Sequence, residues 1–239
     1  MYAEFLTKEE MEYNLRDLSR ELKNEFGRKA NFELIIVGGA AIALRYGFRE
    51  TTQDIDAILS AGASSIKDAV RRVSDKNKID PNWLNSDFVK TRSYSKALIE
   101  HSKFYKTYNQ VLQVRIIEDA FLVAMKLKSF RVYKNDMSDI VGVIQESPNI
   151  SIDKIKDACL KLYGSTAEIS DAAWSFVSDV ISGKIDYCNV KDEEVGNREL
   201  LLEFEKDYDK VLHEGNLNDV LEQLKKKRTN LTIMDSFKQ

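Results

Sequence analysis

The stretch Ile35–Leu59, IIVGGAAIALRYGFRETTQDIDAIL, decides the fold of this chain. It opens with an apolar run that ends at Val37 and is predicted to be a strand. The pair Gly38-Gly39 then lets the backbone turn tightly and come close to a ligand. A short helix of small residues is predicted over 40–46, and a second apolar strand follows it. The stretch therefore predicts a strand, a glycine turn, a helix and a strand in close succession.

Two aspartates stand two positions apart in the second strand. Side chains two apart on a strand point to the same side, so Asp54 and Asp56 share one face while Ile55 and Ala57 face the core. Neighbouring carboxylates repel each other, and this raises one pKa unless a cation lies between them. A hard divalent ion such as Mg²⁺ (or Mn²⁺), shared with substrate phosphates, is the expected cofactor.

An alternative without chemistry is a buried strand whose two edge aspartates only face water. The order of the two motifs favours chemistry, because Gly38-Gly39 and Asp54-x-Asp56 together resemble the nucleotidyltransferase superfamily, the DNA polymerase β-like fold. The form Thr52-x-Asp54-Ile55-Asp56 is similar to its bacterial AbiEii-like and DUF6036-like branch, which includes toxin–antitoxin and phage-defence components. The resemblance implies an α+β fold with an α/β-type core: a small mixed β-sheet flanked by helices and followed by a helical C-terminal part.

A second fragment, EDAFLVAMKLKSFRVYKNDMSDIVGV over 118–143, adds to the resemblance. It is similar to the family's A-x-K-L helix, which carries Lys126, and to the D-x-x-D-I segment, which carries Asp136 and Asp139. The resemblance implies that Lys126 neutralises triphosphate charge and that Asp136 or Asp139 binds lysine, arginine or the ribose. The alternative is that Lys126 reaches from a core helix to water and Asp136 is a plain helix cap.

The resemblance thus assigns residues to three roles. The metal ligands are Asp54 and Asp56, and Lys126 joins them as a catalytic residue. The nucleotide-binding residues that it implies are Gly38, Gly39, Thr52, Lys126, Asp136 and Asp139.

A third metal-binding carboxylate, usual in the superfamily, is not evident. It would lie on a strand within 88–117, where alternating apolar residues such as Tyr94 and Ile99 predict two or three antiparallel strands. Only Asp87, Glu100 and Glu118 lie in or near these strands. This departure leaves two readings open, an active transferase and a fold that has lost catalysis.

Composition narrows the class of protein. The 239 residues are 43% hydrophobic and 31% charged, as in ordinary globular proteins, and the net charge of -3 argues against a strongly basic nucleic-acid surface. Two cysteines and two histidines, widely spaced, cannot assemble a usual zinc site. No stretch approaches a membrane span, and the first residues are too charged for a secretory signal, so we expect a cytoplasmic protein without a membrane partner.

Three parts are predicted along the chain. A nucleotidyltransferase-like core spans 1–147 and begins with a helix capped by Thr7 and Glu10, a helical C-terminal domain spans 148–228, and a tail covers 229–239. The predicted activity is transfer of an NMP from an NTP to a hydroxyl of RNA, a protein or a small molecule. The alternative is an inactive binding or antitoxin-like partner, and either fits a partner protein from a two-gene system. An unrelated nucleotide-binding α/β fold is disfavoured because GxGxxG and the P-loop lysine are missing.

Overall fold

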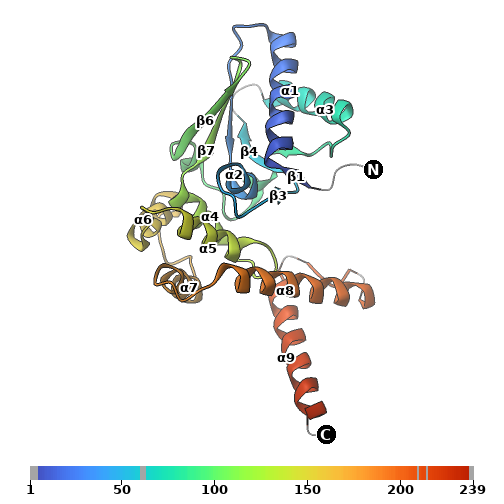
Figure 1. Ribbon diagram of the computed structural model, residues 1–239, viewed down its shortest axis with the longest axis vertical. Helices are drawn as coiled ribbons and strands as arrows, with labels where there is room; N and C mark the ends of the chain where they lie inside the picture. The colour runs from blue at the N-terminus through green and yellow to red at the C-terminus, as the bar shows by residue number, and fades with distance from the viewer. Residues whose placement is uncertain (1–4, 60–62, 209, 214, 237–239) are drawn as a thin grey trace.

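The computed structural model describes residues 5–59, 63–208, 210–213 and 215–236. These segments contain a five-stranded mixed sheet in the order β5-β4-β2-β7-β6, with helices packed around it, and a separate two-stranded sheet (Figure 1). The α+β prediction, with a helical C-terminal part, is confirmed. The strands of the large sheet are β2 (Phe32–Ile36), β4 (Ile55–Leu59), β5 (Leu84–Asn85), β6 (Ser102–Tyr108) and β7 (Leu112–Ile117).

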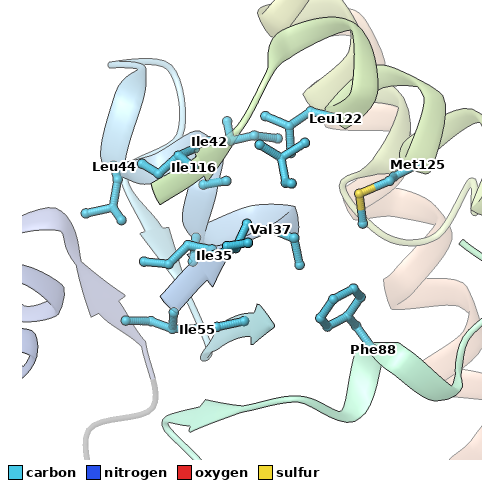
Figure 2. Close-up of a cluster of buried hydrophobic side chains, with 14 of the residues drawn as sticks. Ile35, Val37, Ile42, Leu44, Ile55, Phe88, Ile116, Leu122 and Met125 are labelled. Carbon is cyan, nitrogen blue, oxygen red and sulfur yellow. The ribbon is translucent and has the colours of Figure 1, made fainter. Parts of the chain in front are cut away.

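Strand β2 lies at the centre of the large sheet. It pairs antiparallel with β4 and parallel with β7, so that Ile36 lies between Ala57 and Ile116. All three of these side chains are buried, because apolar runs on central strands are covered on both faces. Figure 2 shows Ile35, Ile55 and Ile116, one from each strand, in one apolar cluster. The core therefore holds β4, and the aspartates on it, against a rigid centre.

The N-terminal helix α1 (Lys8–Phe26) begins as predicted. Thr7 Oγ1 accepts a hydrogen bond from the Glu10 amide at 3.3 Å, and Glu10 Oε2 accepts one from the Thr7 amide at 2.8 Å. The sequence did not reveal that the residues just before this helix form a strand. Strand β1 (Leu6–Thr7) pairs antiparallel with β3 (Thr51–Thr52), with Leu6 opposite Thr52. The start of the described chain therefore lies beside the segment that leads to Asp54.

The region after β5 differs from the prediction. The strands expected around Tyr94 and Ile99 are wrong, since this stretch forms two 3-10 helices, η1 (Asp87–Lys90) and η2 (Lys96–Ile99). The hydroxyl of Ser95 accepts the Ala97 amide and so caps η2, a local interaction that competes with strand pairing. Strands β6 and β7 form the expected antiparallel pair, but β7 joins the sheet parallel to β2.

The remaining helices fall into two groups. The four helices α4 (Asp119–Ser129), α5 (Asp136–Glu146), α6 (Ile152–Tyr163) and α7 (Asp171–Ile181) contribute to the main apolar cluster of the sheet. A second, small cluster of Tyr133, Leu201 and Leu221 joins α8 (Tyr187–Asp207) and α9 (Leu217–Ser236) to the segment before α5. Helix α9 points away from the body of the molecule (Figure 1) and continues to Ser236, so helical structure extends into the stretch predicted as a tail. The bounds of the two helices between α1 and α4 are α2 (Gly38–Arg45) and α3 (Ala63–Asn77).

Candidate active site

The aspartate pair lies where β4 begins. Asp54 directly precedes the strand and Asp56 is its second residue, and both are half-buried. Ile55 and Ala57 between and after them are fully buried. The predicted division of this strand into a carboxylate face and a core face is therefore confirmed.

The neighbouring strand β5 places an amide beside the carboxylates. Asn85 lies in register with Asp56, and its Nδ2 donates a hydrogen bond to Asp54 Oδ2 at 2.8 Å. Its Oδ1 accepts the Asp87 amide at 2.8 Å, which fixes the orientation of the amide group. Asn85 thus orients one carboxylate of the pair without supplying a charge.

The charge of the pair is only partly balanced. The pKa of Asp56 is raised to about 6, chiefly by burial and also by the charge of Asp54, while the charges of Lys126 and Arg131 act in the opposite direction. Within the described residues neither aspartate forms a salt bridge with lysine or arginine. Two carboxylates that repel each other fit a divalent cation with a preference for oxygen ligands. The described part of the chain contains no group of three or more His, Cys, Asp or Glu that could hold a metal, so phosphates or water would have to complete the ligand set.

The glycine pair begins helix α2 rather than preceding it. The helix starts at Gly38, not at Ala40 as predicted, and it ends at Arg45, before the expected stop at Gly47. Gly38 has a φ of +62°, a conformation that side chains disfavour, and a Cβ there would lie 3.6 Å from Asp56 Oδ2. The first amides of a helix have no partner within the helix and attract anions. The amino terminus of α2 therefore adjoins the Asp56 carboxylate.

Gly39 makes room for an arginine that sequence reasoning missed. A Cβ at this position would clash with the guanidinium of Arg49. Arg49 is held in place by two contacts, since its Nη1 donates to Asp139 Oδ2 and its Nε donates to the Thr51 carbonyl at 3.3 Å. The second glycine is thus needed for the close approach of a cation to the start of α2.

Lys126 and the two acids of α5 form a buried network. Lys126 Nζ lies 2.9 Å from Asp136 Oδ1 and 2.8 Å from Asp139 Oδ2, while Arg131 Nε lies 2.8 Å from Asp136 Oδ2. Burial by itself would raise the pKa of Asp136, but Lys126 and Arg131 outweigh it and hold that pKa well below its usual range. Together with Arg49, three cations surround two aspartates. Lys126 pairs with both acids instead of extending to water, and Asn135 rather than Asp136 occupies the cap position of α5. The roles of these residues toward a nucleotide stay a prediction.

A third acid from a distant helix caps α5. Glu194 on α8 is buried, and its Oε1 accepts the amides of Met137 at 2.8 Å and Ser138 at 3.3 Å, while its Oε2 accepts the Ser138 hydroxyl. Burial raises the pKa of Glu194 to about 7 despite these hydrogen bonds, and the charge of Asp139 contributes in the same direction. Helix α8 is thereby tied to the end of α5 that carries the network.

Several of these groups line one cleft with a volume of about 830 Å³, within the size range of small-molecule sites. One part of its lining comes from the sheet and from the α4–α5 region, and the other part comes from α8, the segment after it and the start of α9. Gly38 and Asp139 do not line the cleft but contact residues that do. The predicted site residues that line it are Gly39, Thr52, Asp54, Asp56, Lys126 and Asp136.

None of the acids considered as a third metal ligand lines the cleft. Glu118 pairs with Lys103 at 3.0 Å, and Glu100 is an exposed residue at the end of η2. Asp87 is exposed and pairs with Lys90 at 2.8 Å, although its charge contributes to the raised pKa of Asp56. The position beside Asp56 in the sheet carries the amide of Asn85.

A family model described as a nucleotidyltransferase of unknown function (DUF6036) matches residues 13–170. The comparisons with curated proteins and with solved structures found no match. No helix in the described segments is both long and apolar enough to cross a bilayer. The matched range holds every predicted site residue and more than half of the chain, while α8 and α9 lie beyond it. The chain therefore belongs to this family of nucleotidyltransferases.

Proposed function

We propose that this protein is a metal-dependent nucleotidyltransferase that moves an NMP group from an NTP to a hydroxyl on RNA, a protein or a small molecule. The observation that carries the proposal is the half-buried pair Asp54 and Asp56, which has no salt bridge within the described residues and shares a cleft with Lys126, Arg49 and Arg131. A metal–triphosphate complex carries both kinds of charge, so its metal ion suits the two carboxylates and its phosphates suit the cations beside them.

Asp54 and Asp56 would hold a Mg²⁺ (or Mn²⁺) ion, which supplies Lewis-acid stabilisation of the charge that develops during phosphoryl transfer. Asn85 keeps the Asp54 carboxylate in one orientation through its hydrogen bond. Two carboxylates suffice for Mg²⁺, because this ion usually retains water and binds substrate phosphates.

The phosphates would lie between the start of α2 and the cations. The amides of Gly38 and Gly39, as the first donors of α2, would donate to these phosphates, and Lys126 and Arg131 add positive charge along the cleft. Asp136 and Asp139 fix these cations before substrate binds, so little reorganisation is needed during the reaction. The acceptor oxygen would bond to the α-phosphorus while the bond to the bridging oxygen breaks, releasing pyrophosphate, and the hydroxyl proton would leave to water.

A second candidate is a catalytically inactive member of the family that acts as a binding or antitoxin-like partner in a two-gene or phage-defence system. The neutral Asn85 beside Asp56, and the lack of a three-acid cluster in the described residues, favour this candidate. The intact aspartate pair and its cationic surroundings oppose it.

Calorimetry with each NTP and Mg²⁺ separates the two candidates. We expect Mg²⁺-dependent binding to the natural chain and its loss in the double variant Asp54→Ala/Asp56→Ala. The double variant Asp68→Ala/Asp75→Ala, which removes two exposed carboxylates from α3, should bind as the natural chain does. If a well-folded natural chain binds no NTP, the transferase proposal is wrong and the partner role is favoured. Binding would justify a search for the acceptor with labelled NTP.

A further inference from the structure

Apolar side chains line the cleft together with the charged groups. Phe5 and Leu202 line it with 49% and 58% of their surfaces exposed, although large apolar side chains are usually buried. They come from opposite ends of the described chain, and further apolar side chains line the same cleft: Tyr133, Leu201, Leu212 and Leu217. An exposed apolar side chain by itself needs no explanation, but a group of them in a polar cleft marks a ligand surface.

We propose that Phe5 and Leu202 bind the nucleobase of the NTP and that α8, with the strand-paired N-terminal segment, forms the base-contacting wall of the site. The inference rests on the proposed function. In the proposed function the triphosphate lies with Lys126, Arg131 and the aspartates, which share the cleft and interact through their charges. The remaining part of an NTP is a sugar and a flat base, and bases stack on aromatic side chains whatever their identity.

The pairing of β1 with β3 gives Phe5 a fixed position. Leu6 lies opposite Thr52 in this antiparallel pair, and extending the register by one residue sets Phe5 beside Gln53, which directly precedes Asp54. The segment that carries the aromatic ring thus lies beside the backbone that leads into Asp54. A nucleotide that reaches from the ring of Phe5 to the aspartate pair would be held at its base and at its phosphates.

Leu202 is also held in a fixed position. Leu201 is 5% exposed and packs in the small cluster with Tyr133, so its neighbour Leu202 is fixed at the cleft. Glu194, two turns earlier on α8, anchors the helix to α5 through three hydrogen bonds. Helix α8 therefore presents Leu202 from a rigid element, as selective binding requires.

The test compares binding of Mg²⁺ complexes of the four NTPs with binding of Mg²⁺–tripolyphosphate, which has no base. We expect the natural chain to bind at least one NTP more tightly than tripolyphosphate. Phe5→Ala and Leu202→Ala should each weaken NTP binding by about 5- to 10-fold and leave tripolyphosphate binding unchanged. Leu160→Ala is the matched control, because Leu160 is 50% exposed on α6 and does not line the cleft.

Each other outcome overturns the inference in a distinguishable way. Equal weakening of both ligands would mean a change in the phosphate site, and unchanged NTP binding would mean that the base lies elsewhere. Unchanged NTP binding with slower transfer would assign the apolar wall to the acceptor. If the folded natural chain binds neither NTP nor tripolyphosphate, the proposed function itself fails. Circular dichroism of each variant confirms that it is folded.

Discussion

Two pairs of aspartates in this protein meet opposite electrostatic surroundings. Asp54 and Asp56 share one face at the start of β4, and Asp136 and Asp139 lie in the first turn of α5. The pKa of Asp56 is raised to about 6 by burial and by its neighbour, whereas the cations around Asp136 hold its pKa below the usual range. The α5 pair is the more buried of the two, and burial raises the pKa of a carboxylate, so burial does not explain why the pKa of Asp136 is the lower one.

The charged groups around each pair explain the difference between the two pKa values. The α5 pair lies at a helix N-terminus, which favours negative charge, and is surrounded by Lys126, Arg131 and Arg49. Within the described residues the β4 pair accepts one side-chain hydrogen bond, from the amide of Asn85, and Lys126 and Arg131 act on Asp56 only through their charge. Identical side chains are thus neutralised where the packing supplies cations, and they keep an unbalanced charge, which the proposed metal ion would neutralise, where it does not. Three predictions test this division.

The largest effect is expected from removing a carboxylate of the α5 pair. Asp136→Ala leaves Lys126 and Arg131 without their shared partner in a buried place, and it should lower the free energy of unfolding by about 3–5 kcal/mol. Chemical denaturation of the metal-free protein measures this change.

The matched variant in the other pair is Asp56→Asn, which keeps the shape and removes a charge that burial disfavours. We expect its free energy of unfolding without metal to be equal to or above that of the natural chain. A loss as large as that of Asp136→Ala would show that the two pairs do not differ as described.

A smaller effect on stability is expected from Glu194, the acid on α8 that caps the start of α5. Its folded pKa of about 7 lies above the ordinary 4.5, so the folded state binds the proton more tightly. This contribution to stability is complete below about pH 4.5 and is lost as pH rises through 7. Glu194→Gln should remove this dependence, so that the variant gains about 1–3 kcal/mol on the natural chain between pH 5 and pH 8.

Denaturation of both proteins across this pH range gives the difference, in which other titrating groups cancel. The charged groups whose fields reach the same place are Asp139 and Lys191, and both remain in the variant. A pH-independent difference between the two proteins would refute a titrating Glu194.

The smallest effect is expected at Gly39. Alanine normally stabilises a helix, but here its Cβ would displace Arg49 from Asp139, and we expect a net loss of about 1 kcal/mol. Because Arg49 lines the cleft, Mg²⁺–tripolyphosphate binding should weaken as well. The control is Gly142→Ala, which meets the ring of Phe48 and should destabilise the fold without changing this binding. If Gly39→Ala and Gly142→Ala bind Mg²⁺–tripolyphosphate equally well, Arg49 does not belong to the phosphate site.

The sequence by itself determined the local features of the site. Alternation along β4 predicted which side chains face the core, and Thr7 and Glu10 predicted the start of the first helix. The sequence also predicted one helix that carries Lys126 and a second that begins at Asp136. These features depend on contacts between residues a few positions apart, whose periodicity is visible in the chain. The prediction of strands around Tyr94 was wrong, because the Ser95 side chain caps a 3-10 helix there despite the alternation of apolar residues.

Only the tertiary structure decided the partners of these features. Arg49 meets Asp139 across 90 positions, Glu194 reaches α5 from α8, and Asn85 comes beside Asp56 by strand pairing. Phe5 joins the cleft through the pairing of β1 with β3. Such contacts leave no periodic signal, because an arginine or a glutamate on a helix surface has the same local pattern whether it faces water or a buried charge. Whether a pair of aspartates is neutralised or keeps an unbalanced charge is set by which distant cations the packing brings to it.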